Sequence, residues 1–175
     1  MDGVHFVQSA FLGGVWCYER VFVRSPSGRR RWNVLGAFNA ASGELTSVAN
    51  DSYITAATVC ELLKKLSIQY AGRSIVIVLD NARYQHCRMM EELAKELKIS
   101  LSFLPSYSPN LNLIERLWKF VKKKCLNNAY YDSFEAFTSG INGCLAQIHG
   151  DYKSEIESFM QPNFQDLKSV RLLAA

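Results

Sequence analysis

The chain has 175 residues, a length that fits a single domain with one substantial core. Hydrophobic residues make up 49% and charged residues 21%, as in ordinary soluble globular proteins, and no segment approaches the ~18 consecutive apolar residues of a membrane helix. The five cysteines are odd in number, scattered and without a CxxC pair. They argue against a disulfide framework or a zinc site, and together with the absence of a secretory signal they predict a protein of the reducing cytoplasm.

The formal net charge is only +4, but the basic residues gather in two blocks. Five arginines lie between Arg20 and Arg31, and a second block runs from Arg116 to Lys124; neither block contains an acid. A polyphosphate partner would need such blocks. Solvated surface faces have the same composition, so the charge alone favours that simpler interpretation.

The first part of the chain has the composition of strands separated by short turns. Ser25–Gly28 and Ser42–Gly43 are turn sequences. The expected strands are Val4–Val7, Cys17–Arg24, Arg31–Ala40 and Glu44–Asn50. Short turns between consecutive strands predict an antiparallel meander.

After residue 54 the hydrophobic period changes to that of helices alternating with strands. A continuous apolar run at Ile75–Leu79 predicts a strand covered on both faces, which ends at Asp80. A further strand is expected at Ile99–Leu104. Helical spacing predicts helices over Thr55–Tyr70, Cys87–Leu97, Leu111–Cys125 and Ser133–His149.

These elements predict an α/β fold: a mixed sheet, in which an antiparallel meander is followed by parallel βαβ units, with helices on both faces. The RNase H-like fold has this order of elements. We expect one domain over residues 1–150 and a helical or poorly ordered tail over residues 151–175.

Three acids stand at positions where a functional site could form. Asp80 follows a buried strand, where ligands collect in α/β sheets, but an acid there also commonly caps the next helix. Glu115 lies at the edge of the apolar stripe of its helix, or alternatively forms a surface pair with Lys119. Asp2 begins the first strand, which a meander would place centrally beside the strand that ends at Asp80; the alternative is an ordinary chain terminus.

Such a trio of carboxylates would suit phosphodiester chemistry. Two Mg²⁺ ions ~3.5–4 Å apart activate water, neutralise charge on the phosphorus and stabilise the leaving oxygen. Mg²⁺ prefers hard oxygen ligands, so a few carboxylates suffice without histidine or cysteine.

The segments Val78–His86 and Leu104–Trp118 resemble the catalytic core of the mariner superfamily of transposases, in its bacterial insertion-sequence branch. The run Pro-x-Tyr-Ser-Pro-x-Leu-Asn-x-Ile-Glu that ends at Glu115 is highly specific, and 34 residues separate Asp80 from Glu115, as in that branch. The resemblance extends from Asp2 to about His149.

The resemblance implies that Asp2, Asp80 and Glu115 are the catalytic metal ligands, holding two Mg²⁺ ions for which Mn²⁺ can substitute. Positions expected to support these ligands or to contact DNA are Asn81, His86 and Asn112, although His86 and Asn112 could equally belong to helix starts. Residues expected on the DNA backbone are Arg29, Arg30, Arg31, Lys119, Lys122 and Lys123.

Members of this superfamily excise DNA at terminal inverted repeats and join the freed ends to target DNA. We therefore expect a nucleoid-associated bacterial enzyme that binds double-stranded DNA, acts as a homodimer and has no membrane partner. Two departures matter: no helix-turn-helix region precedes Met1, and the first strand is expected to be truncated. The alternative function is an inactive transposase remnant that serves as a DNA-binding or assembly module. A flavodoxin-like small-molecule enzyme is disfavoured, because no glycine-rich phosphate loop follows any strand.

Overall fold

The computed structural model describes residues 1–9, 18–19, 22, 24, 29–80, 87–105 and 111–160. Strands β1 (Asp2–Val7), β2 (Arg31–Asn39) and β3 (Glu44–Asn50) form an antiparallel sheet in that order, and β4 (Ile75–Leu79) pairs in parallel with β5 (Ile99–Phe103). The nitrogen of Met1 donates a hydrogen bond to the carbonyl of Val78 at 2.7 Å. This bond links β1 to β4 and so brings the two sheets edge to edge.

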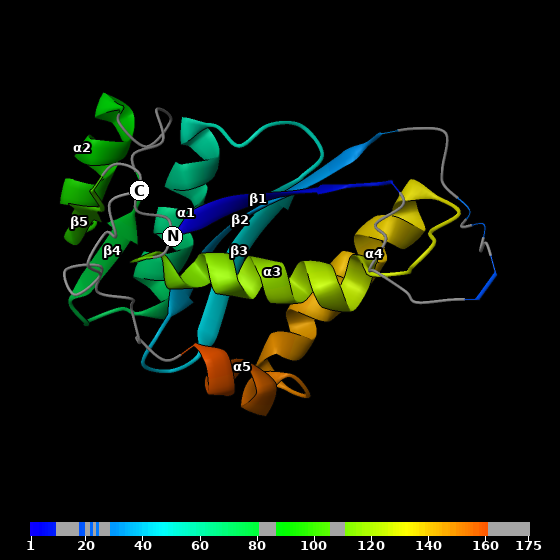
Figure 1. The fold of residues 1–175 in the computed structure, drawn as a ribbon. Coiled ribbons are helices and arrows are strands. Elements are labelled where there is room, and N and C mark those ends of the chain that lie inside the picture. Colours follow the sequence, from blue (N-terminus) through cyan, green and yellow to red (C-terminus); the bar gives the residue numbers. More distant parts are fainter. Residues whose placement is uncertain are drawn as a thin grey trace, which may run out of the picture.

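The helices lie on both sides of the sheets (Figure 1). Their bounds are Ala56–Gln69 for α1, Arg88–Glu96 for α2, Leu113–Leu126 for α3, Phe134–Ala146 for α4 and Lys153–Phe159 for α5, with a 3₁₀ turn at Gln147–His149. Ser133 caps α4, because its hydroxyl accepts a hydrogen bond from the backbone nitrogen of Ala136 at 3.0 Å.

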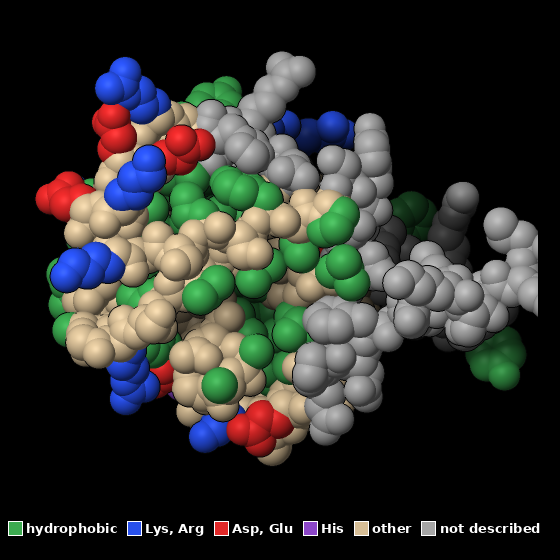
Figure 2. Space-filling model, turned by 90° about the vertical axis from the view of Figure 1, so that its left-hand side faces the viewer, with side chains coloured by type: hydrophobic (Ala, Val, Ile, Leu, Met, Phe, Trp, Pro, Cys, Tyr) green, Lys and Arg blue, Asp and Glu red, His purple; other side chains and the backbone are tan. Residues whose placement is uncertain are grey.

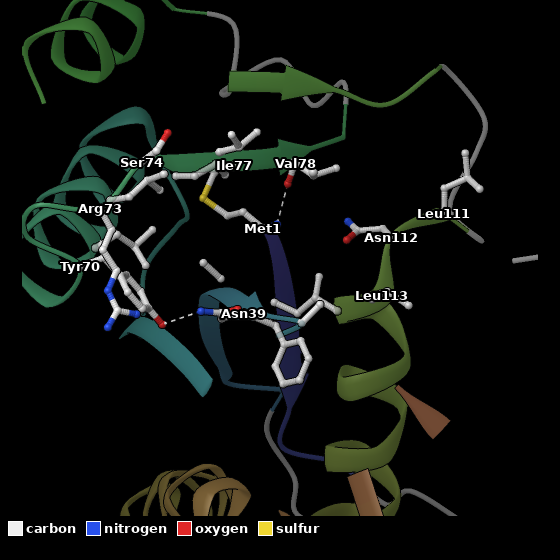
Figure 3. A pocket seen from close by; sticks show the side chains of 17 residues that line it. Met1, Asn39, Tyr70, Arg73, Ser74, Ile77, Val78, Leu111, Asn112 and Leu113 are labelled. Atoms are coloured by element: carbon white, nitrogen blue, oxygen red, sulfur yellow. Dashed lines mark hydrogen bonds between the residues drawn. The ribbon is translucent and has the colours of Figure 1, made fainter. Parts of the chain in front are cut away.

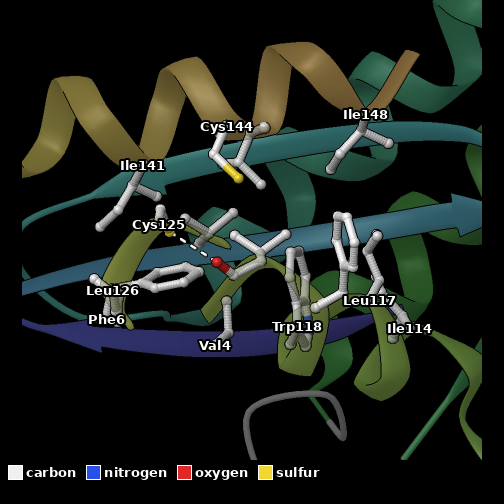
Figure 4. Packing of buried hydrophobic residues seen from close by; sticks show 14 of the residues in the cluster. Val4, Phe6, Ile114, Leu117, Trp118, Cys125, Leu126, Ile141, Cys144 and Ile148 are labelled. Atoms are coloured by element: carbon white, nitrogen blue, oxygen red, sulfur yellow. Dashed lines mark hydrogen bonds between the residues drawn. The ribbon is translucent and has the colours of Figure 1, made fainter. Parts of the chain in front are cut away.

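Each face of the antiparallel sheet has its own buried cluster, because side chains alternate along a strand. Leu35 of β2 and Met1 belong to the cluster with α1, α2 and β4, whereas Val34 of β2 packs with α3, α4 and α5. On β1, Val4 and Phe6 point to the α3 side (Figure 4). The even-numbered residues of β1 therefore face α3.

Most expected elements are confirmed within one or two residues. Expected strands Val4–Val7, Arg31–Ala40 and Glu44–Asn50 correspond to β1, β2 and β3, and each expected helix has its counterpart. The strand expected at Cys17–Arg24 falls largely outside the described residues. Among the described residues, no helix is long and apolar enough to span a membrane.

The expectation that Ile75–Leu79 is covered on both faces is wrong. Ile77 and Leu79 are buried against α1 and α2, but Val76 and Val78 are 62% and 41% exposed. In the described structure helices cover only one face of β4. An apolar run records which residue types a strand has but not which of its faces a helix covers.

Candidate active site at the meeting of β1, β4 and α3

The three candidate acids lie on one side of the molecule. Asp2 alternates in phase with Val4 and so faces α3, and Glu115 lies in the first turn of α3. Asp80 follows β4 directly and continues the phase of Val78, which points away from the α1 side. Three separate elements thus bring these carboxylates to the same face.

The acids lie close enough for their charges to act on Asp2. The pKa of Asp2 is raised to about 6, mainly by burial and also by the charges of Asp80 and Glu115, while the hydrogen bond from the Gly3 nitrogen lowers it. That nitrogen lies 2.7 Å from the Asp2 carboxylate. A carboxyl in this environment loses its proton reluctantly unless a cation compensates the charge.

Glu115 is in a similar environment. Burial raises the pKa of Glu115, Lys119 one turn further along the helix lowers it, and the charge of Asp80 raises it. Asp80 is half-buried. The charges of Asp80 and Glu115 therefore act on Asp2, and the charge of Asp80 acts on Glu115.

The three acids lie on one face of the molecule, but their carboxylates are not arranged around one position that an ion could occupy. Within the described residues, no three side chains of His, Cys, Asp or Glu form a group that could hold a metal ion. The donor type nevertheless fits Mg²⁺ or Mn²⁺, since all three side chains offer hard oxygens. The amino group of Met1 lies beside them, and its burial lowers its pKa to about 6.

Asn112 occupies the N-cap position of α3, three residues before Glu115. The side chain is 6% exposed, and its Nδ2 has no hydrogen-bond partner among the described residues. Its carbonyl accepts the backbone hydrogen bond of Glu115 at 3.1 Å. Asn112 thus starts the helix, three residues before Glu115, and its expected role beside the metal ligands or on DNA stays a prediction. Asn81 and His86 lie outside the described residues.

Gly36 is a residue of this site that the sequence did not single out. It stands opposite Asp2 in the pairing of β1 with β2. A Cβ atom at Gly36 would lie 2.7 Å from Cη2 of Trp118, so only glycine lets α3 pack this closely on the strand. Trp118 follows Glu115 by less than one turn, which means that this contact fixes the height of Glu115 above the sheet. A glycine inside a long strand was the available signal.

The expected DNA-contacting residues lie on two elements. Lys119 and Lys123 of α3 are exposed and Lys122 is half-exposed, on the helix that carries Glu115. Arg29, Arg30 and Arg31 are also exposed, at and just before the start of β2.

Several basic residues have structural partners, Arg30 of the expected DNA-contacting set among them. The guanidinium of Arg30 stacks on the ring of Phe134 at 3.7 Å from its centroid, which fixes its position. Lys124 forms an ion pair with Glu155 at 2.8 Å, and Arg116 donates to the carbonyl of Phe159 at 3.2 Å. Lys124 and Arg116 therefore join α3 to α5.

Comparison with known proteins identifies a family. Residues 19–138 match the family described as DDE superfamily endonuclease. This segment includes Asp80 and Glu115, whereas Asp2 precedes it. The chain is also 29% identical, over 99 residues, to the insertion element IS630 uncharacterized 39 kDa protein of Shigella sonnei, a match that covers 55% of this chain and 29% of that protein.

Solved structures show the same fold. The mariner transposase Mos1, in a paired-end complex with Mn, superposes with a TM-score of 0.64 at 12% identity, over 91% of this chain and 52% of that chain. The catalytic core domain of BIV integrase gives a TM-score of 0.52 at 17% identity, over 73% of this chain and 87% of that chain. The RNase H-like fold expected from the order of elements is thus confirmed. The chain spans about half the length of the Mos1 chain, and its match covers 29% of the IS630 protein.

Proposed function

The chain belongs to the DDE superfamily endonuclease family, and from this premise we propose that it is the catalytic domain of an insertion-sequence transposase that cleaves DNA and transfers strands with the help of a divalent metal. The observation that carries the proposal is that Asp2, Asp80 and Glu115 lie on one face, where the charges of Asp80 and Glu115 act on Asp2 and the charge of Asp80 acts on Glu115. The Mos1 complexes, one with the left transposon end and one with Mn, support DNA and a divalent metal as partners.

In this proposal Asp2, Asp80 and Glu115 hold Mg²⁺, or Mn²⁺ in its place, as two ions. When bound, the metal supplies charge neutralisation at the phosphorus and activation of the attacking water. The protein supplies the geometry: β1 and β4 position the aspartates, and the packing of Trp118 on Gly36 holds α3 and with it Glu115. The exposed Lys119 and its neighbours on α3 would bind phosphates of a duplex beside the acids.

The decisive experiment replaces the acids conservatively. We expect Asp80→Asn and Glu115→Gln each to reduce Mn²⁺-dependent cleavage of a supercoiled plasmid at least ~10³-fold while DNA binding is retained, because an amide cannot replace a carboxylate as a metal ligand. Glu135→Gln is the matched control, since Glu135 stands in the first turn of α4 as Glu115 does in α3. Cleavage at the wild-type rate in either of the first two variants would refute the site.

A second measurement tests whether Asp2 belongs to the site. We expect Asp2→Asn to weaken Mn²⁺ binding about tenfold or more in titration calorimetry, since one of three carboxylate ligands is lost. Equal binding by the wild type and the variant would remove Asp2 from the ligand set. Absence of binding in both would instead favour the alternative, a DNA-binding module without cleavage. A homodimer on paired DNA ends belongs to the same proposal and is tested by light scattering of the DNA complex.

A further inference from the structure

Two cysteines that are distant in the sequence lie side by side in the core beneath α3 and α4. Cys125 stands in the last turn of α3 and Cys144 in the last turn of α4, and each is 7% exposed. Both side chains belong to one buried cluster (Figure 4), and a hydrogen bond joins the two thiols. The fold therefore makes a neighbouring pair from two of the scattered cysteines.

Tyr131 connects the two helices beside the thiols. Its hydroxyl donates a hydrogen bond to the backbone carbonyl of Cys125 at 2.7 Å. Its ring fills the space beside Gly140 of α4, where a Cβ atom would lie 2.7 Å from the Tyr131 hydroxyl oxygen. Cys144 follows Gly140 by about one helical turn, so the contact between Tyr131 and Gly140 also keeps Cys144 against the end of α3.

The two thiols differ in how readily they lose a proton. The hydrogen bond from Cys125 and the charge of Lys124 lower the pKa of the Cys144 thiol, although its burial raises it. The hydrogen bond to Cys144 and burial raise the pKa of the Cys125 thiol. While Cys144 is neutral, the proton of Cys125 has another acceptor in the Val121 carbonyl, 2.9 Å from its sulfur. Cys144 is therefore the thiol that ionises first, and Cys125 keeps its proton.

The thiol pair lies apart from the surface features near the candidate acids. A groove of about 450 Å³ lies beside Met1, and Tyr70 and Asn112 are among the residues that line it (Figure 3). Hydrophobic side chains also gather on the end of the molecule that carries β4 (Figure 2). Cys125 and Cys144 do not line the groove, so what the thiols do is independent of the proposed metal site.

We propose that Cys125 and Cys144 form a site of reversible oxidation, at which hydrogen peroxide converts the two thiols into a disulfide that joins α3 to α4. The Cys144 thiolate attacks one oxygen of the peroxide: an S–O bond forms, the O–O bond breaks, and the departing hydroxide takes up the proton released by Cys144. The Cys125 sulfur then attacks the sulfenic acid sulfur, the S–O bond breaks, and the leaving hydroxide takes the Cys125 proton. Two thiols are thus oxidised and one peroxide is reduced to two waters. A small oxidant suits the site because both sulfurs are buried.

One tryptic peptide of the full chain reports on this pair. Cleavage after Lys124 and Lys153 releases residues 125–153, which contain Cys125 and Cys144 and no other cysteine. The reduced, folded chain is treated with hydrogen peroxide, the remaining thiols are alkylated, and the digest is analysed by mass spectrometry without reductant. We expect the peptide to lose two hydrogens and to escape alkylation, and dithiothreitol should restore both thiols.

Serine variants test whether the two cysteines act together. Cys125→Ser and Cys144→Ser should each abolish the loss of two hydrogens. Cys60→Ser is the matched control and should leave it unchanged, because Cys60 is also buried but belongs to the cluster on the other face of the sheet. The proposal is overturned if both thiols of the wild-type peptide persist at peroxide concentrations that oxidise the half-buried Cys87. A disulfide from either cysteine to a different partner would overturn it as well.

A disulfide between α3 and α4 should also change the stability of the fold. It would close a loop of roughly 20 residues and so restrict the unfolded chain, and we expect the midpoint of thermal unfolding to rise by about 5–10 °C on oxidation. The Cys125→Ser and Cys144→Ser variants should show no rise after the same treatment. An unchanged or lower midpoint for the oxidised wild type would contradict the proposal, because the folded chain would then not hold the two sulfurs in a position to bond.

Discussion

Asp2 links the site to the stability of the fold through its protonation. Its pKa is about 6 in the folded chain, against an ordinary value of 3.8, so the folded state binds the proton more tightly than the unfolded state. The contribution of Asp2 to stability in metal-free buffer should therefore be lost as the pH rises from about 4 to about 6. We expect Asp2→Asn to remove this loss, about 3 kcal/mol, as measured by urea unfolding at a series of pH values.

The comparison needs a control for general effects of removing an acid. Asp51→Asn serves this purpose, since Asp51 is exposed in the turn after β3 and far along the chain from the site. The control should show the same pH slope as the wild type. If the curves of the wild type and Asp2→Asn run parallel between pH 4 and 6, burial and like charge do not act on Asp2 as described.

At this scale the sequence singled out the acids as candidates but not their surroundings. Asp80 and Glu115 stand at a strand end and beside an apolar stripe, patterns that leave simpler roles open, and the family motif that they match made them candidate ligands. The contact between Gly36 and Trp118 could not be predicted, because it joins residues that are far apart in the chain and depends on how α3 lies on β2. The same holds for the stacking of Arg30 on Phe134. Packing across elements has no local signature.

Helix α3 is held over the sheet by a close contact that one methyl group would disturb. A Cβ atom at Gly36 would lie 2.7 and 2.9 Å from two ring carbons of Trp118 and 3.0 Å from Leu45. We expect Gly36→Ala to destabilise the protein by about 1–3 kcal/mol, because the Trp118 ring is buried and cannot move freely. Thermal unfolding measures this as a fall of about 2–4 °C per kcal/mol.

Gly143→Ala is the matched control within the same fold. Gly143 lies inside α4, and a Cβ atom there has no neighbour within 4 Å. This substitution should stabilise the protein by about 0.5–1 kcal/mol, since alanine loses less backbone freedom in a helix. Opposite signs for the two substitutions are expected. A neutral Gly36→Ala would mean that α3 is not seated on β2 as described.

The elements themselves were predictable because their hydrophobic periods are clear. The helix expected over Thr55–Tyr70 is α1 at Ala56–Gln69 with those two residues as its caps, and β3 has the expected bounds. The error at β4 concerned coverage: both faces of the strand are apolar, but helices pack only on the side of Ile77 and Leu79. The position of neighbouring elements is a tertiary property that periodicity does not contain.

Among the described residues, the lysines of α3 and those of α1 belong to helices on opposite faces of the antiparallel sheet. Helix α3 carries Glu115 and four exposed or half-exposed lysines on one side of the antiparallel sheet, whereas α1 packs on the opposite side. Under the proposed function, we expect a duplex that brings its phosphates to the acids to lie along α3. Lysines of α1 and α2 would then remain in solvent, although they contribute equally to the net charge.

This division predicts which charges determine the salt dependence of DNA binding. We expect the combined variant Arg29→Ala, Lys119→Ala and Lys122→Ala to reduce the slope of log affinity against log salt by about 2–3, because each phosphate contact contributes ~0.9. Lys64→Ala with Lys95→Ala, on exposed positions of α1 and α2, should leave the slope nearly unchanged. Fluorescence anisotropy with a labelled duplex of arbitrary sequence measures both. If the two variants lose equal slope, net charge rather than the α3 face governs binding, and the duplex does not lie where the acids require it.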